Sequence, residues 1–202
     1  MKQTELIKWC GFVGMLGAAL IIIGSIIHPP IESPETIVSL AWVWAHILNA
    51  KGAILLLLGL VAIFSKMAEK SGKLGLLGFV LTFVSLAELF IIFSFAAMIE
   101  PILAKEAPEL LDMNGPLFQG LFGLFFMATV ITTLFGFLLF GISVYKTNKE
   151  KWPGAAIILG TLPLSLIFIK PETPEFVYNI GFIIISVGFL ELSRQVWEVK
   201  TK

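Results

Sequence analysis

Apolar residues follow one another along this chain in long, nearly unbroken runs rather than in short alternating stretches. A helix crosses the roughly 30 Å hydrocarbon core of a bilayer with about 20 such residues, whereas strands of a membrane barrel are about 10 residues long and alternate in polarity. We therefore predict an all-α, polytopic integral membrane protein in which residues 1–202 form a single transmembrane domain. The six predicted spans cover about residues 7–27, 39–65, 74–98, 117–144, 153–169 and 176–195.

Three of the breaks between runs share one local pattern, in which a polar residue and a proline end a run and an acidic helix start follows. Proline disfavours helix at the residue before it and is well tolerated in the first turn of the next helix. A Glu in that first turn interacts favourably with the helix dipole. We therefore predict three helical hairpins in series, with Ser33 and Thr173 as N-cap candidates. The three sites are His28-Pro29 with Glu32-Ser33-Pro34-Glu35, Glu100-Pro101 with Glu106-Ala107-Pro108-Glu109, and Lys170-Pro171 with Glu172-Thr173-Pro174-Glu175.

Basic residues are concentrated at one side of the predicted bundle. The termini and the two loops on their side carry 11 Lys and Arg residues, and the three opposite loops carry only Lys105 and Lys170. Because basic loops remain cytoplasmic, we predict that both termini face the cytoplasm, in the inner membrane of a prokaryote. The three outer loops are acidic, with Glu32, Glu35, Glu100, Glu106, Glu109, Asp112, Glu172 and Glu175.

Composition makes the lipid bilayer the expected partner of most of the chain. Hydrophobic residues make up 57% of the 202 and charged residues 14%, against about 45–50% and about 25% in a soluble domain. The first apolar run, from about Cys10 to Ile27, exceeds the 7–15 residues of a signal-peptide core, so we expect it to remain as a membrane helix. No motif or spacing indicates a nucleic-acid partner.

The sequence carries none of the common catalytic motifs: it has no phosphate-binding glycine loop, no serine nucleophile motif and no H-E-x-x-H. The single cysteine, Cys10, excludes an internal disulfide and a multi-cysteine metal site. Enzyme activity is therefore the third-ranked hypothesis for this chain.

Lys51 and Glu88 are ionisable residues inside predicted spans, where charge is costly and commonly functional. At about 1.5 Å per residue, they lie about 20 Å and about 21 Å above the inner edge of the second and third spans. A short loop joins these spans, so they should be antiparallel neighbours. Equal depth predicts a buried Lys51–Glu88 ion pair, which either fixes the register of the two helices or relays protons or ions.

Two histidines lie near the outer edge of the membrane, His28 about 30 Å up the first span and His46 about 27 Å up the second. Neutral imidazole is a common ligand of metals and of haem, and Glu100 at the top of the third span can add a carboxylate. His28, His46 and Glu100 therefore form a candidate site for a metal ion or haem b. Asn49, one turn below His46, is a further candidate ligand-binding residue. The other interpretation is that these histidines are ordinary hydrogen-bonded polar residues, because no H-x-x-x-H spacing is present.

Two functions remain open from the sequence. The leading hypothesis is an outward-facing binding protein or small transporter-like bundle, in which His28, His46 and Glu100 hold a metal, haem or another small ligand above Lys51 and Glu88. The alternative is a structural or accessory subunit of a membrane complex, in which the same groups are satisfied internally or by a partner membrane subunit.

Overall fold

Every element of the described chain is helical. The computed structural model describes residues 2–112, 114–169 and 173–198, and it contains no strand within these ranges. The predicted all-α fold is therefore confirmed, while Lys170 and Glu172 of the third helix-start signal lie outside the described residues. The elements are α1 (Gln3–Ile27), α2 (Pro34–Ile37), α3 (Leu40–Met98), α4 (Glu100–Glu106), the 3-10 helix η1 (Pro108–Leu111), α5 (Leu121–Thr147), α6 (Trp152–Ile169) and α7 (Glu175–Trp197).

Within the described residues, four helical segments are long and apolar enough to cross a membrane: α1, the segment Leu40–Glu106, α5 and α7. The fifth apolar helix, α6, is shorter and has Pro163 in its interior. The segment Leu40–Glu106 has 67 residues, far more than the roughly 20 that one crossing needs. Its length is explained by a sharp turn within α3.

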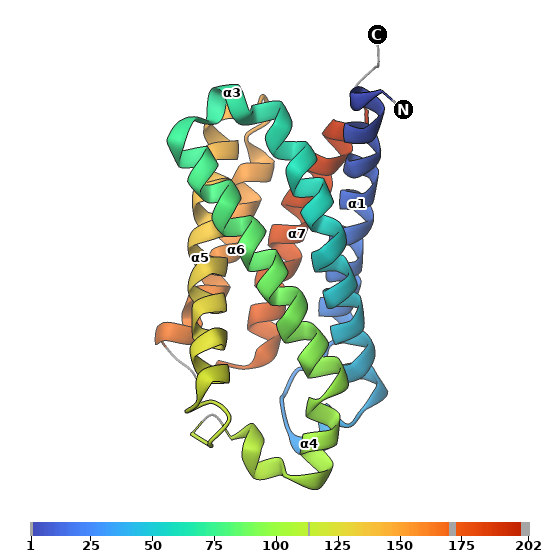
Figure 1. Cartoon of the computed structure of the whole chain (residues 1–202), viewed down its shortest axis with the longest axis vertical. Coiled ribbons are helices and arrows are strands. Elements are labelled where there is room, and N and C mark those ends of the chain that lie inside the picture. Colours follow the sequence, from blue (N-terminus) through green and yellow to red (C-terminus); the bar gives the residue numbers. More distant parts are fainter. Residues whose placement is uncertain (1, 113, 170–172, 199–202) are drawn as a thin grey trace.

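The long helix α3 turns back on itself at Gly72, where φ is 58° and ψ is −162°. We call residues 40–71 the first arm and residues 73–98 the second arm. Near their far ends the indole N–H of Trp42 donates a hydrogen bond of 3.0 Å to the carbonyl oxygen of Ala96. The arms are therefore antiparallel neighbours (Figure 1), as predicted for the second and third spans.

Substitution of Gly72 should destabilise the turn through the backbone alone. Its φ and ψ fall in a region that is essentially restricted to glycine, and nothing lies within 4 Å of a Cβ added there. We expect Gly72→Ala to lower the free energy of unfolding by about 1–3 kcal/mol, measured by denaturant titration in mild detergent. Lys73→Ala, at an exposed helical position, is the control, and an equally small effect of both changes would contradict this account.

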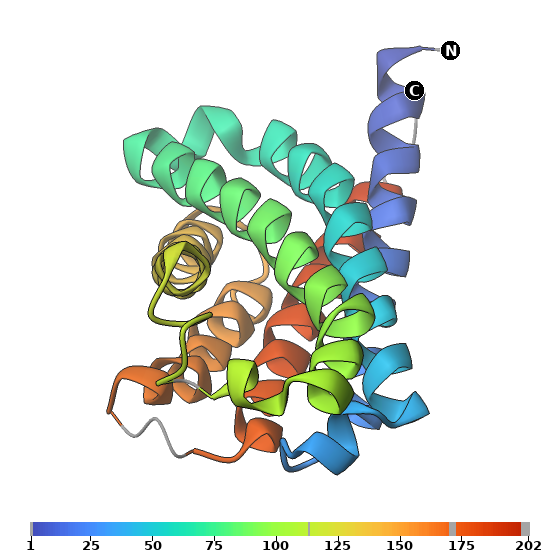
Figure 2. The same cartoon turned by 60° about the horizontal axis from the view of Figure 1, so that its bottom comes forward.

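Glycines bring neighbouring helices of the bundle into backbone contact. The order around the bundle is α1, the first and second arms of α3, α5, α6 and α7, and α7 packs against α1 to close the ring (Figure 2). Close packing at small residues is the usual way in which membrane helices associate. The glycines at which an added Cβ would come within 3.0 Å of the opposing helix include Gly17 and Gly59 (α1 with α3), Gly78 and Gly136 (α3 with α5), Gly154 (α5 with α6), Gly160 and Gly181 (α6 with α7) and Gly11 (α1 with α7).

The two ends of the bundle differ in what they carry. The start of α1, the end of α7 and the turn of α3 lie together at the top of Figure 1, and α4 lies at the bottom. We call the first the basic end and the second, which also holds α2 and η1, the acidic end. The acidic residues described at the acidic end are Glu32, Glu35, Glu100, Glu106, Glu109, Asp112 and Glu175.

The helix starts at the acidic end follow the predicted pattern in part. Ser33 is the N-cap of α2, and its side chain accepts a hydrogen bond of 3.3 Å from the backbone N–H of Thr36. Helix α7 instead has Pro174 in the N-cap position, without a side-chain cap. The predicted cap at Ser33 is confirmed, and Thr173 precedes the N-cap of α7 rather than forming it.

Candidate functional site

Both histidines belong to an aromatic cluster at the acidic end. His28 is the C-cap of α1, and Trp42 and His46 lie one turn apart on the first arm of α3. The ring centres are 4.9 Å apart for His28 and His46, 4.9 Å for His28 and Trp42, and 4.4 Å for Trp42 and His46. The three rings are therefore in mutual contact, and the structure brings the two predicted histidines together.

Trp42 holds this cluster in place. Besides its hydrogen bond to Ala96, it packs in a small buried core with Ile37 of α2 and Ala104 of α4. Through Trp42 the cluster is therefore connected to both arms of α3 and to the short helices α2 and α4.

Each histidine has its Nδ1 atom bonded to a backbone carbonyl. Nδ1 of His46 lies 2.9 Å from the Trp42 oxygen, and Nδ1 of His28 lies 2.7 Å from the Pro29 oxygen. A carbonyl can only accept, so Nδ1 carries the proton and Nε2 is the bare nitrogen of each neutral ring. No hydrogen bond from the described residues reaches either Nε2 atom.

The surroundings favour the neutral form of His28. Burial lowers the pKa of His28, although the Pro29 carbonyl acts in the opposite direction. His46 is only 6% exposed. Two neutral imidazoles held at Nδ1, with free Nε2 atoms, correspond to the state in which histidines bind metal ions.

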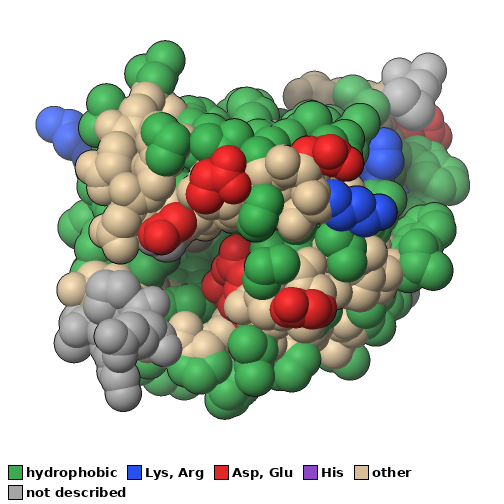
Figure 3. All heavy atoms as spheres, turned by 90° about the horizontal axis from the view of Figure 1, so that it is seen from below, with side chains coloured by type: hydrophobic (Ala, Val, Ile, Leu, Met, Phe, Trp, Pro, Cys, Tyr) green, Lys and Arg blue, Asp and Glu red, His purple; other side chains and the backbone are tan. Residues whose placement is uncertain are grey.

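Glu100 lies within a group of acidic residues at the start of α4. Its Oε2 atom is buried without a hydrogen-bond partner in the described chain. Burial raises the pKa of Glu100, and the charges of the nearby Glu32 and Glu175 carboxylates act in the same direction. Burial also raises the pKa of Glu32, in the loop between α1 and α2. Seen from this end, acidic side chains surround a hollow in the surface (Figure 3).

Asn49 is fully enclosed below the histidines. It is 2% exposed, and its Oδ1 atom has no hydrogen-bond partner in the described part of the chain. That oxygen lies against α1 at Gly24, where an added Cβ would collide with it. His46 is oriented by Trp42 and not by Asn49, so the role of Asn49 in ligand binding stays a prediction.

The predicted three-residue site is only partly assembled. His28 and His46 are in contact, but the described residues contain no group of three His, Cys, Asp or Glu side chains arranged to hold a metal ion. No hydrogen bond in the described chain links Glu100 to either histidine. A metal or haem site with Glu100 as a ligand therefore stays a prediction.

Lys51 and Glu88 do not form the predicted ion pair. Among the described residues, ion pairs involve only Arg194, with Glu191 and Glu198. The Lys51 side chain is exposed on the outside of the bundle, whereas Glu88 accepts a hydrogen bond of 2.5 Å from the hydroxyl of Thr132 on α5. The two residues lie at matching heights of the antiparallel arms, but Lys51 is on the outer face of its helix.

Loss of the Thr132 hydroxyl should leave the half-buried Glu88 carboxyl without its hydrogen-bond donor and thereby destabilise the fold. We expect Thr132→Val to lower the free energy of unfolding by about 1–3 kcal/mol, and Thr132→Ser to retain most of the stability. Thr161→Val is the matched control, because the Thr161 hydroxyl bonds only to the carbonyl of Ile158 in its own helix. Denaturant titration in detergent measures all three, and an effect of Thr132→Val no larger than that of the control would contradict the role of Glu88.

Three residues of this region were not selected from the sequence as site residues: Trp42, Glu32 and Glu175. Trp42 lies four residues before His46, and this spacing alone places both on one face of a helix. From the sequence, Glu32 and Glu175 are interpreted as helix-start residues, and only the closed ring of helices brings them near Glu100.

No protein-family model, curated protein or solved structure matches this chain.

Proposed function

We propose that this multi-pass membrane protein binds a divalent transition-metal ion at its acidic end, through the Nε2 atoms of His28 and His46. The observation that carries the proposal is the contact of two rings that are each bonded at Nδ1 to a backbone carbonyl. Such bonds orient metal-binding imidazoles and raise their basicity. Imidazole suits zinc, copper and nickel ions.

The acidic group at the same end has a supporting role in this proposal. Clefts lined by one sign of charge raise the local concentration of the opposite ion, so the acidic side chains around the hollow in Figure 3 would attract cations to this end when they are ionised. The buried Oε2 of Glu100 gains a partner if the ion draws it in as a third ligand. This arrangement suits a protein that takes up or passes on a cation from the outer side.

A metal ion fits the histidine pair better than haem does. Two axial ligands of one haem lie on opposite faces of the porphyrin, with the macrocycle between them. The rings of His28 and His46 are in direct contact, with centres 4.9 Å apart, and leave no room for that plane. The geometry therefore favours coordination of one bare ion by both rings.

Metal content gives the direct test. The protein is purified without a histidine tag, incubated with Zn²⁺, desalted and analysed for metal. We expect about one ion per chain in the unmodified protein and less than about a tenth of that in the His28→Ala, His46→Ala double variant, with Thr161→Ala as a control that retains the ion. Equal zinc in all three proteins would overturn the proposal.

We also propose that six helical crossings place the acidic end outside the cytoplasm and both termini inside. The concentration of Lys and Arg at the basic end supports this orientation. Single cysteines at positions 106 and 149, in a Cys10→Ser background, report it in intact cells through an impermeant maleimide. Labelling of position 106 alone supports the orientation, and labelling of both or of 149 alone contradicts it.

The exposed Lys51 favours a second candidate function, that of an accessory subunit. Its side chain lies on the same outer face as Ile54, Leu58 and Val61, which are 39%, 48% and 45% exposed. A charge on a lipid-facing surface is costly, and an acidic group of a partner helix would offset that cost. Under this hypothesis Lys51→Leu reduces the size of the complex on a native gel while Lys51→Arg retains it. An unchanged size in both variants would exclude this role of Lys51.

A further inference from the structure

A second polar feature lies at the basic end, far from the histidines. A cavity of about 240 Å³ opens between the first arm of α3, the end of α5 and the end of α7. Three lysines line it, Lys66, Lys70 and Lys149, and its floor is apolar, with Ile63 and Leu192 among the contributors. The volume lies below the roughly 300–1,000 Å³ of pockets for drug-sized ligands, so a small charged group is the appropriate occupant.

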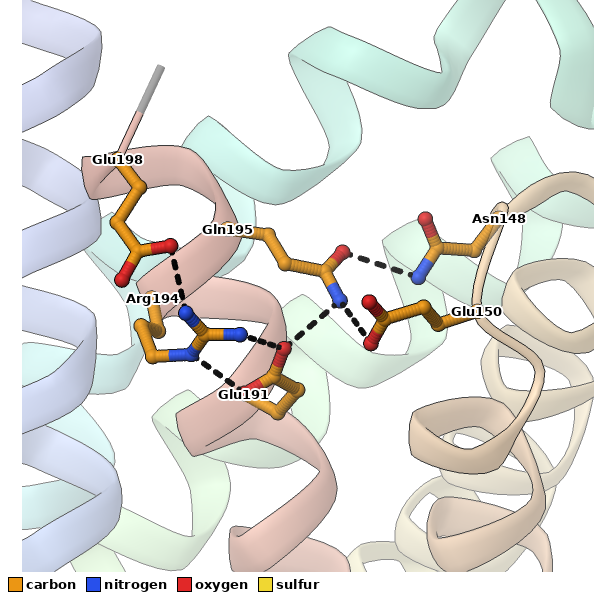
Figure 4. A network of polar contacts seen from close by, with 6 residues as sticks. All are labelled: Asn148, Glu150, Glu191, Arg194, Gln195 and Glu198. Atoms are coloured by element: carbon orange, nitrogen blue, oxygen red, sulfur yellow. Dashed lines mark hydrogen bonds and ion pairs between the residues drawn. The ribbon is translucent and has the colours of Figure 1, made fainter.

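The polar groups around this cavity are held by a hydrogen-bond network (Figure 4). The Asn148 side chain donates to Oε1 of Gln195 at 3.1 Å. Nε2 of Gln195 donates to Glu150 at 3.2 Å and to Glu191 at 3.0 Å. Both carboxylates are thereby engaged by Gln195, and no acidic residue of the described chain lines the cavity.

The three lysines differ in how they are engaged. Nζ of Lys66 donates to the carbonyl oxygens of Gln195 and Val196 in the last turn of α7, at 3.3 Å and 3.2 Å. Lys66 therefore stabilises the end of this helix, where the dipole favours a cation. The ammonium groups of Lys70 and Lys149 form no ion pair or hydrogen bond within the described residues, and both side chains are exposed at the cavity.

We propose that this cavity binds a phosphate group, with Lys70 and Lys149 as its cationic ligands. A lysine ammonium is a common phosphate-binding group that acts as a point charge, and the Asn148 and Thr147 side chains supply further polar atoms at the rim. The apolar floor suits the glycerol and acyl-chain region of an anionic lipid, and the cavity lies at the end where basic residues would face anionic headgroups. The same cationic ligands would accept the phosphate of a free solute.

The test is native mass spectrometry of the protein in a neutral detergent with added phosphatidylglycerol. We expect one tightly retained lipid per chain, and at least about a tenfold weaker retention in Lys70→Gln, Lys149→Gln. The matched control is Lys73→Gln, Lys146→Gln, which removes the same charge from exposed positions at the same end that do not line the cavity. Lys66 is left unchanged because it bonds to α7, and circular dichroism checks that both variants fold.

Competition with inorganic phosphate distinguishes a lipid headgroup from a free phosphate compound as the source of the ligand. Displacement of the lipid by millimolar phosphate, with phosphate binding that is weakened in Lys70→Gln, Lys149→Gln, assigns the site to a free phosphate compound. Retention of the lipid under phosphate assigns it to the headgroup. Equal loss of lipid in the test and control variants would show general surface attraction and overturn the proposal, as would the absence of any retained lipid.

Discussion

Replacement of His46 by alanine should reduce the affinity for Cu²⁺ or Zn²⁺ by at least about 100-fold. Loss of groups that merely orient a metal-binding histidine already costs 10–100-fold, and His46 is one of two nitrogen ligands in the proposed site. Removal of His28 should have an effect of the same size, because both rings present an Nε2 atom without a hydrogen bond in the described chain. Isothermal titration in detergent measures each affinity.

Variants of the neighbouring residues separate coordination from packing. Glu100→Gln keeps the shape of the side chain and should weaken binding by less than the histidine substitutions if the carboxylate is a supporting ligand. Trp42→Phe keeps an aromatic ring but loses the bond to Ala96, so it should lower stability more than affinity. An affinity that falls equally in all variants, including Asn49→Ala, would indicate a general disturbance of the acidic end instead of metal coordination.

Replacement of Gly59 by valine should be among the most destabilising single changes in the bundle. A Cβ at this position would lie 2.5 Å from the Cα atom of Gly14, so α1 and the first arm of α3 are in backbone contact. Overpacking of a close interface typically costs about 1–3 kcal/mol and occasionally more, and neither backbone can yield as a flexible side chain would. We expect a loss of at least about 3 kcal/mol in the free energy of unfolding.

Ala128→Val provides the matched control for this prediction. It introduces the same side chain into a helix, α5, but at an exposed position on the outside of the bundle. The control should change the stability by less than about 0.5 kcal/mol, as is usual for surface positions. Similar losses for Gly59→Val and Ala128→Val would contradict the close contact of α1 with α3.

The antiparallel pairing of the two arms of α3 could be predicted from residue spacing alone. A rise of about 1.5 Å per residue placed Lys51 and Glu88 at the same depth. The observed contacts of Trp42 with Ala96 and of His46 with Phe93 have the same register. Depth depends only on the number of residues from the turn, and the breaks in hydrophobicity define the position of the turn well.

Prediction of the direction in which the side chains of the first arm face requires a second sequence pattern, the spacing of small residues. The small residues Ala45, Gly52 and Gly59 recur every seven positions and are all buried. Since small residues mark contacts between membrane helices, this stripe identifies the face of the first arm that packs against α1, and Lys51 lies off it. The predicted ion pair rested on depth alone and took no account of the direction in which Lys51 faces. The prediction was wrong for this reason, since the Lys51 side chain is exposed on the outside of the bundle.

The acidic group and the lysine-lined cavity could not be predicted from the sequence for a different reason. Glu32, Glu100 and Glu175 precede or begin three separate helices, and only the order of helices around the ring decides which of these ends meet. Lys70 and Lys149 likewise come from separate hairpins. Local patterns define each helix end, whereas the ring closure depends on glycine contacts between segments far apart in the chain.

Coordination of a single ion by both histidines is tested most directly by pulsed electron paramagnetic resonance of the protein loaded with one equivalent of Cu²⁺. Two equatorial imidazoles give combination lines from their two remote nitrogens, and we predict these lines in the unmodified protein and the pattern of one imidazole in His28→Ala. A spectrum without imidazole nitrogen, or one that His28→Ala and His46→Ala leave unchanged, would contradict the proposed site.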